Sequence, residues 1–144
     1  MPDPGACADN YANETILVVE DSDPIRRVVC AMLSQNGYNC LEASDGSEAL
    51  NLLRAEDTIQ LVLTDVVMPK MDGAELAGHM AREYPAIPIL FMSGYSDNPL
   101  VRAIERSPIF LPKPFTVTAL TSTVRRALEE PWHGLAEWRR GSGP

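Results

Sequence analysis

Residues 61–73 constrain the fold of this chain more than any other stretch, because a short apolar run in them stops at an acid, Asp65. Such a run is typical of a buried parallel strand. Pro69 and the Asp72-Gly73 pair then predict a turn. An acid at the exit of a parallel strand lies at the carboxyl edge of the sheet, where ligands bind in open α/β folds. A single acid after a strand is more often a turn or cap residue. Whether Asp65 belongs to a ligand site therefore depends on the residues in the rest of the chain.

Apolar runs alternate with amphipathic segments along the rest of the chain. Strands are predicted at residues 15–19, 39–43, 61–65, 87–92 and 109–111. Helices are predicted from Asp23 to Gly37, over 46–55, from Gly73 to Pro85, weakly over 100–106, and from Thr116 to Pro131. Asp23 is expected to cap the first helix, with Pro24 at its first position. The buried face of that helix is expected to hold Ile25, Val28, Val29, Met32 and Leu33.

The order of these elements is strand then helix, repeated five times. This order predicts an α/β fold, a flavodoxin-like doubly wound five-stranded parallel sheet of order 2-1-3-4-5 with helices on both faces. The first strand is followed by Glu20 and Asp21, and the third ends at Asp65. In this topology the first and third strands are neighbours, so we expect the three acids to converge at one crevice.

Length and charge limit the classes of function. A chain of 144 residues predicts one domain, here 15–130, between a mobile tail at 1–14 and a C-terminal tail at 131–144. A net charge of -8 argues against nucleic acid or an anionic membrane as a partner. No stretch resembles a membrane helix or a signal peptide, which favours a cytoplasmic protein. The three cysteines are odd in number and lack metal-ligand spacing, so we expect reduced thiols.

The convergent acids call for a cation. Two like charges 4 Å apart cost about 4 kcal/mol at an effective dielectric of 20, so protons or a cation must neutralise the cluster. Oxygen ligands suit Mg²⁺, and the absence of His and Cys from these motifs disfavours zinc. Lys113 leaves the fifth strand and Ser93 the fourth, which adds a cation and a hydroxyl. Together these groups suit a phosphoryl group, with Asp65 as the nucleophile.

Four motifs carry a resemblance to a known family. They lie at residues 16–21, 63–69, 91–97 and 110–115. In combination they resemble receiver domains of two-component response regulators and hybrid histidine kinases. The roles that this resemblance implies are Asp65 as phosphoacceptor, Glu20, Asp21, Asp65 and the main-chain carbonyl of Val67 as Mg²⁺ ligands, Ser93 and Phe110 as a switch pair, and Lys113 as the phosphate-binding lysine. It also implies a cis Lys113-Pro114 bond.

The resemblance further implies the partners. A histidine kinase or a histidine phosphotransfer domain would supply the phosphoryl group, and a downstream protein or the domains of its own kinase would receive the signal. Such a domain is not a stand-alone turnover enzyme. The motifs at 91–97 and 110–115 look most like C-terminal receivers of hybrid histidine kinases. A homodimer stays open.

Some features depart from the family pattern, and two other functions stay open. Glu20 stands where many members have Asp, and Pro99 interrupts the segment at 100–106. One alternative is a metal-dependent aspartyl-phosphate phosphatase, but such enzymes usually carry an acid two residues after the nucleophile, where this chain has Val67. The other is a receiver-like scaffold that is never phosphorylated.

Overall fold

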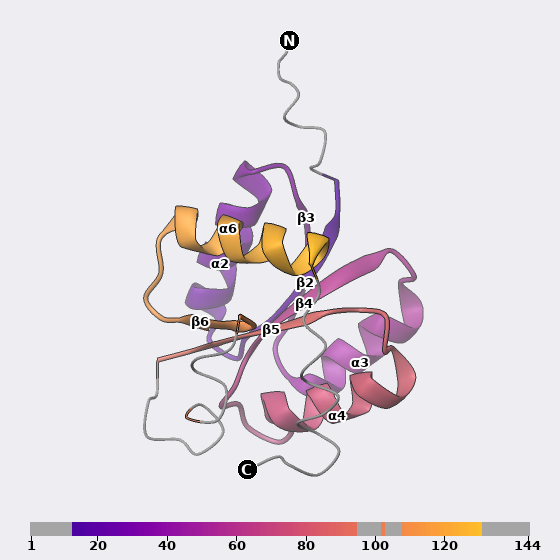
Figure 1. Cartoon of the computed structure of the whole chain (residues 1–144). Helices are drawn as coiled ribbons and strands as arrows, with labels where there is room; N and C mark the ends of the chain where they lie inside the picture. Colours follow the sequence, from indigo (N-terminus) through magenta and orange to yellow (C-terminus); the bar gives the residue numbers. More distant parts are fainter. Residues whose placement is uncertain (1–12, 95–101, 103–107, 131–144) are drawn as a thin grey trace.

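A five-stranded parallel sheet forms the centre of the molecule (Figure 1). The structure is a computed structural model and describes residues 13–94, 102 and 108–130. The strands are β2 (Thr15–Val19), β3 (Asn39–Ala43), β4 (Ile59–Asp65), β5 (Ile89–Ser93) and β6 (Phe110–Pro112). Their order, β3-β2-β4-β5-β6, is the predicted order 2-1-3-4-5. β3 and β6 are therefore the edge strands.

Helices cover both faces of the sheet, as predicted. The described residues form α2 (Asp23–Gln35), α3 (Gly46–Ala55), α4 (Gly73–Glu83) and α6 (Val117–Glu129). α2 and α6 lie on one face, and α3 and α4 on the other (Figure 1). The three inner strands are thereby buried on both sides, which explains why their sequences are apolar without alternation.

Helix α2 differs from the prediction in its cap and in its buried face. Its N-cap is Ser22, whose hydroxyl accepts from the Ile25 N–H, whereas Asp23 is already helical. Ile25 is 40% exposed and Val28 54% exposed, and Arg26 lies among the buried residues of the helix. The apolar stripe of α2 is wider than the sheet can cover, so its outer edge faces solvent.

The predictions of the helices at 46–55, from Gly73 and from Thr116 are confirmed, while the last strand is displaced by one residue. α3 has the predicted bounds, and α4 begins at Gly73 with a reciprocal capping box between Asp72 and Glu75. The strand predicted at 109–111 spans Phe110–Pro112. Phe110, a member of the predicted switch pair, thus begins an edge strand.

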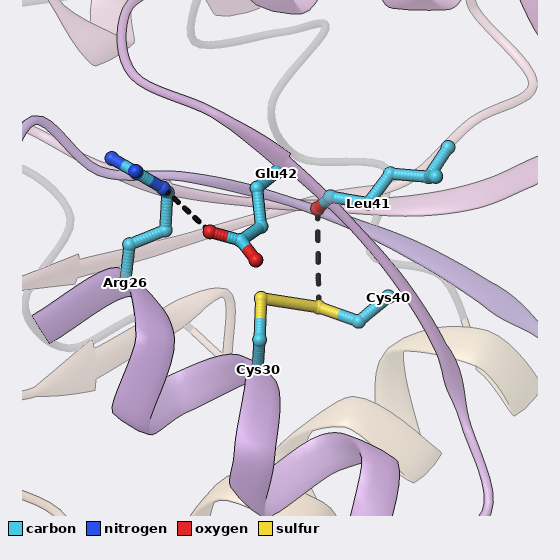
Figure 2. The surroundings of a disulfide bond; sticks show 5 residues. All are labelled: Arg26, Cys30, Cys40, Leu41 and Glu42. Carbon is cyan, nitrogen blue, oxygen red and sulfur yellow. Dashed lines mark hydrogen bonds and ion pairs between the residues drawn. A yellow bond between two sulfur atoms is a disulfide. The ribbon is translucent and has the colours of Figure 1, made fainter. Parts of the chain in front are cut away.

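Two of the three cysteines, all expected as reduced thiols, are oxidised in this structure. Cys30 of α2 and Cys40 of β3 form a disulfide, with their Cα atoms 5.8 Å apart (Figure 2). That separation is typical of disulfides. The helix and the strand that follows it pack against each other, which brings together two residues whose contact the spacing in the sequence does not reveal.

Several predictions lie outside the described residues. They concern the N-terminal tail up to residue 12, the segment 100–106 and the C-terminal tail 131–144. Within the residues that are described, no helix combines the length and the apolar character needed to span a membrane.

Candidate functional site

Three acids gather at the carboxyl edge of the sheet, as predicted. β2 and β4 are paired so that Val19 lies opposite Thr64. Glu20 and Asp65 directly follow these two positions, so the pairing brings them together. Glu20, Asp21 and Asp65 each offer a carboxylate oxygen, and these atoms lie within 4.8 Å of one another. Glu20 and Asp65 are buried, whereas Asp21 is exposed.

The Asp65 carboxyl is in an unusual electrostatic environment. Only 5% of the residue is exposed, and its Oδ1 accepts a hydrogen bond of 2.9 Å from the Val66 N–H. Burial, and after it the charge of Glu20, raise the pKa of Asp65 to about 6, against the opposite effect of Lys113. A divalent cation would remove most of this repulsion. A cation or another positive charge beside the Asp65 carboxyl would therefore stabilise its ionised form.

Lys113 reaches the acids from the end of the edge strand β6. Its Nζ lies 2.6 Å from Glu20 Oε1 and 3.6 Å from Asp65 Oδ1. The Lys113-Pro114 peptide bond is cis, which confirms the prediction. The Lys113 N–H also donates to the main-chain oxygen of Ser93, at 2.9 Å. The end of β6 is thus fixed to the end of β5, and the ammonium is held over the acids.

Ser93 and Phe110, the predicted switch pair, are on neighbouring strands but not at the same level. Ser93 ends β5, is 2% exposed, and pairs in register with Pro112. Phe110 pairs with Phe91, two residues earlier on β5, and is half-buried against the core. The strands that carry the pair are therefore adjacent, and Phe110 lies further from the carboxyl edge than Ser93.

The loop after Asp65 returns to the acid through Gly73, a residue whose role the sequence did not reveal. The Gly73 N–H donates to the Val66 main-chain oxygen at 2.8 Å. A Cβ at position 73 would lie 2.7 Å from the Asp65 main-chain oxygen, a distance that side chains do not tolerate. Within this loop Val67 is 38% exposed. The Asp72-Gly73 pair predicted a turn, and the close approach to Asp65 explains why a glycine is needed there.

Arg26 is a second residue that the sequence interpretation missed. Its Nη1 donates to the main-chain oxygen of Glu20 at 2.9 Å, and its Nε donates to Glu42 on β3 at 2.9 Å. A signal was present in the sequence. Arg26 precedes the buried residues Val29, Cys30 and Leu33 at helical spacing, so it lies on the apolar face of α2. A buried arginine on such a face needs acceptors, and one of them belongs to the acidic cluster.

The donor set of the cluster fits a hard divalent cation. All three side chains offer oxygen, and no histidine or cysteine accompanies them in the cluster. Mg²⁺ prefers one or two carboxylates and keeps several waters. Burial and, after it, the charge of Glu20 raise the pKa of Asp65, and the charge of the cation would act against both effects. Glu20, Asp21 and Asp65 are the residues that would hold it.

Comparison with known proteins decides the family. The sequence model of the family described as response regulator receiver domain matches residues 16–125, which is most of the chain. The chain belongs to the receiver domain family. Receiver domains are the signalling modules of two-component response regulators and hybrid kinases, and they are generally regulatory.

Individual relatives of this receiver domain occur both as kinase parts and as separate proteins. The sensor kinase CckA of Brucella abortus (strain 2308) is 36% identical over 125 residues, which are 85% of this chain and 13% of CckA. The response regulator receiver protein CpdR of the same organism is 34% identical over 116 residues, 78% of this chain and 95% of CpdR. A crystal structure of the receiver domain of the hybrid histidine kinase CckA superimposes with a TM-score of 0.63 at 36% identity, covering 79% of this chain and 98% of that domain. The receiver domain thus spans a small part of the kinase and nearly all of CpdR.

Proposed function

We propose that this receiver domain accepts a phosphoryl group on Asp65, with Mg²⁺, from a histidine kinase or a histidine phosphotransfer domain. The observation that carries the proposal is the cluster in which three carboxylates meet Lys113 at the carboxyl edge of the sheet. An Asp65 oxygen would attack phosphorus, and the bond from phosphorus to the donor's histidine nitrogen would break. The similarity to sensor kinase and response regulator receivers supports this donor class.

Charge balance supports the assignment of roles. The three carboxylates carry -3, a bound Mg²⁺ would bring them to -1, and Lys113 would bring the site to zero. Mg²⁺ and the Lys113 ammonium then offset the charge of the phosphoryl oxygens. In this proposal the main-chain carbonyl of Val67 is the fourth protein ligand of the cation, and the Ser93 hydroxyl donates to a phosphoryl oxygen.

An apolar hollow beside the site suits the docking of the donor. It has a volume of about 370 Å³ and lies between α2 and the segment after β6. Its lining residues are Pro24, Ile25, Val28, Val29, Met32, Lys113, Pro114 and Phe115. Lys113 lines the hollow and also contacts Asp65, so a protein seated in the hollow would lie next to the acceptor. Exposed apolar side chains that gather at one place, as Ile25 and Val28 do in this hollow, are typical of protein contacts.

Phosphorylation of the proposed site would change the surface of the domain and would not yield a reaction product. Phosphorylation would draw the Ser93 hydroxyl toward Asp65 by a charge-assisted hydrogen bond, and Phe110 would move into the space left behind. The surface around β6 and α6 would then select a downstream protein or the domains of its own kinase. The domain would not be a stand-alone turnover enzyme. The motifs at 91–97 and 110–115 favour the C-terminal receiver of a hybrid histidine kinase, and the similarity to the sensor kinase CckA supports a kinase as the parent protein. A kinase donor implies a cytoplasmic location.

Incubation with acetyl phosphate and Mg²⁺, followed by intact mass, tests the proposal. We expect a gain of one labile phosphate that is absent without Mg²⁺ and absent in Asp65→Asn. Rapid release of inorganic phosphate over many turnovers would instead favour the phosphatase. No phosphate gain under any of these conditions would favour the unphosphorylated scaffold.

A further inference from the structure

Two adjacent links join α2 to the edge strand β3. One is the Cys30–Cys40 disulfide, and the other is the ion pair between Arg26 and Glu42, 2.9 Å long (Figure 2). Residues four apart on a helix and two apart on a strand share a face. Cys30 follows Arg26 by four positions, and Glu42 follows Cys40 by two. The covalent and the ionic link therefore connect the same two surfaces, side by side.

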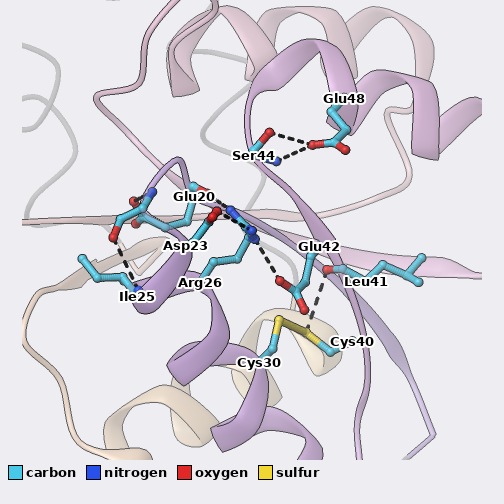
Figure 3. Close-up of polar contacts among 11 residues, drawn as sticks. Glu20, Asp23, Ile25, Arg26, Cys30, Cys40, Leu41, Glu42, Ser44 and Glu48 are labelled. Atoms are coloured by element: carbon cyan, nitrogen blue, oxygen red, sulfur yellow. Dashed lines mark hydrogen bonds and ion pairs between the residues drawn. A yellow bond between two sulfur atoms is a disulfide. The ribbon is translucent and has the colours of Figure 1, made fainter.

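The ionic link leads directly to the acidic cluster. Arg26 is 9% exposed and donates to the main-chain oxygen of Glu20 as well as to Glu42 (Figure 3). The Glu20 carboxylate in turn accepts from the Ser22 N–H, at 3.1 Å, just before α2. It also accepts from Lys113, at 2.6 Å. A shift of α2 relative to β3 would therefore move Arg26, and Arg26 would transmit that movement directly to Glu20.

We propose that the Cys30–Cys40 disulfide is a redox-sensitive clamp on α2, and that opening it slows phosphoryl transfer to Asp65. The inference rests on the proposed phosphoacceptor function. Mg²⁺ demands nearly ideal octahedral geometry, so it binds best when its ligands are held in place. With the clamp closed, Arg26 holds the Glu20 backbone in one position. With the clamp open, the ion pair to Glu42 and the packing between the two elements still connect α2 to β3, but no covalent bond limits their relative movement.

The reductant is a dithiol, or two molecules of a monothiol such as glutathione that react in the same two steps. A thiolate of the dithiol attacks the Cys40 sulfur, because Cys40 is half-buried whereas Cys30 is only 7% exposed. Cys30 leaves as a thiolate and takes a proton, and a mixed disulfide with Cys40 remains. The second thiolate of the dithiol attacks the dithiol sulfur that is bonded to Cys40. Cys40 leaves as a thiolate and takes a proton. Two electrons and two protons reach the protein, and the dithiol becomes a disulfide.

The setting favours regulation over permanent stabilisation. Disulfides are rare where thiols are kept reduced, and those that occur there are usually transient or redox-sensing. The proposed kinase partners act in such a compartment. The clamp would therefore be open by default and would close under oxidising conditions, which would promote phosphorylation.

The experiment uses the full chain in a Cys7→Ser background, so that Cys30 and Cys40 are the only thiols. Protein equilibrated with oxidised or reduced glutathione is desalted, and maleimide labelling with intact mass counts the free thiols. We expect no label in the oxidised form and two labels in the reduced form. Each form is then phosphorylated with acetyl phosphate over a range of Mg²⁺ concentrations. The matched control carries Cys30→Ser and Cys40→Ser as well.

The expected result is an initial rate about fivefold lower in the reduced form, and a higher Mg²⁺ concentration at half-maximal rate. Across a series of glutathione ratios, rate and thiol labelling should change together, and the control without the pair should not respond. Equal rates in both forms, each with one phosphate on Asp65, would overturn the clamp and leave the proposed function intact. Two free thiols at every glutathione ratio would also overturn it. No phosphate in either form would overturn the proposed function as well.

Discussion

Among single residues, Gly73 is the one most closely fitted to the acceptor. A Cβ there would lie 2.7 Å from the Asp65 main-chain oxygen and 3.1 Å from the Val66 Cα, and neither backbone atom can move away cheaply. Gly73→Ala should therefore lower the free energy of unfolding by about 1–3 kcal/mol, although helix propensity at the start of α4 favours alanine. It should also slow phosphorylation, because Asp65 has to shift. Chemical denaturation and acetyl phosphate kinetics measure the two effects.

Gly94→Ala is the matched control for that substitution. Among the described residues, a Cβ at Gly94 would meet the Lys113 Cβ, at an ordinary 3.8 Å. We expect this variant to unfold within about 0.5 kcal/mol of the parent. If Gly73→Ala were as stable as Gly94→Ala, the close approach of Gly73 to Asp65 would not be a constraint on the loop.

The charge of Asp65 should cost stability when no cation is bound. Its pKa is raised from 3.8 to about 6, so the folded protein binds the proton more tightly than the unfolded chain does. The free energy of unfolding should fall as the pH rises from about 4 to about 6, and stay lower above that. Asp65→Asn removes this fall and should be more stable at pH 7 by about 1–3 kcal/mol in the absence of Mg²⁺.

Urea unfolding of parent and Asp65→Asn at pH 4 and at pH 7, with a chelator, measures that difference. The two proteins should be closest at pH 4, where the carboxyl is largely protonated. Addition of Mg²⁺ at pH 7 should stabilise the parent more than the variant. A parent that is more stable than Asp65→Asn at pH 7 without Mg²⁺ would contradict the electrostatic account of the site.

At the scale of elements, strand ends were predictable and side-chain contacts between elements were not. An apolar run that stops at an acid marks a strand exit, so Glu20, Asp21 and Asp65 could be placed together from the sequence. Helical periodicity predicted the apolar stripe of α2. Which part of that stripe is covered depends on how far the neighbouring strands extend beneath the helix. For the same reason the contacts of Arg26 and the Cys30–Cys40 pair could not be foreseen. The ammonium of Lys113 was expected at Asp65, and it lies closer to Glu20.

The uncovered part of the α2 stripe should matter for the protein donor and not for a small one. Val28 is 54% exposed and lines the hollow beside Lys113. Val28→Asp should slow transfer from a phosphorylated histidine phosphotransfer domain about tenfold or more, since a charge would be buried on docking. Phosphorylation by acetyl phosphate should be nearly unchanged, because this small donor does not need to dock in the hollow. The ratio of the two rates is the measurement.

Ala31→Asp is the matched control for the docking face. Ala31 is also an exposed residue of α2, but it does not line the hollow. It should leave both rates close to those of the parent. If Val28→Asp and Ala31→Asp slowed protein-donor transfer equally, a general charge effect would explain the result and the hollow would have no special role.

At the scale of the whole molecule, the disulfide should contribute to global stability. It joins residues 10 apart in sequence, and a loop of that size is worth about 2–3 kcal/mol in the chain-entropy account. Reduction of the Cys7→Ser protein should lower its urea midpoint accordingly, without a comparable change in slope. The variant that also lacks Cys30 and Cys40 should show no effect of reductant. An unchanged midpoint on reduction would mean that the bond does not constrain the unfolded chain.

Phosphorylation of Asp65 should change the position of the Phe110 ring on the edge strand next to β5. Ser93 is buried at the end of β5, and Phe110 begins the adjacent edge strand, half-buried against the core. When the Ser93 hydroxyl moves toward a phosphoryl oxygen, an inward Phe110 gains apolar burial and needs no partner for a hydroxyl. Phosphate only shifts an equilibrium between two arrangements, so a phosphate mimic should act in the same way.

The three phenylalanines of the chain make this switch measurable by NMR of ring-labelled protein. Beryllofluoride with Mg²⁺ should shift the ring signal of Phe110 most, because its environment changes from half-buried to buried. Phe91, opposite it on β5 and already fully buried, serves as the internal control and should shift less. Asp65→Asn should abolish the response of both. A Phe110 signal that stays in place while the mimic binds Asp65 would show that this ring is a fixed part of the core, and that the phosphate signal leaves the site by another route.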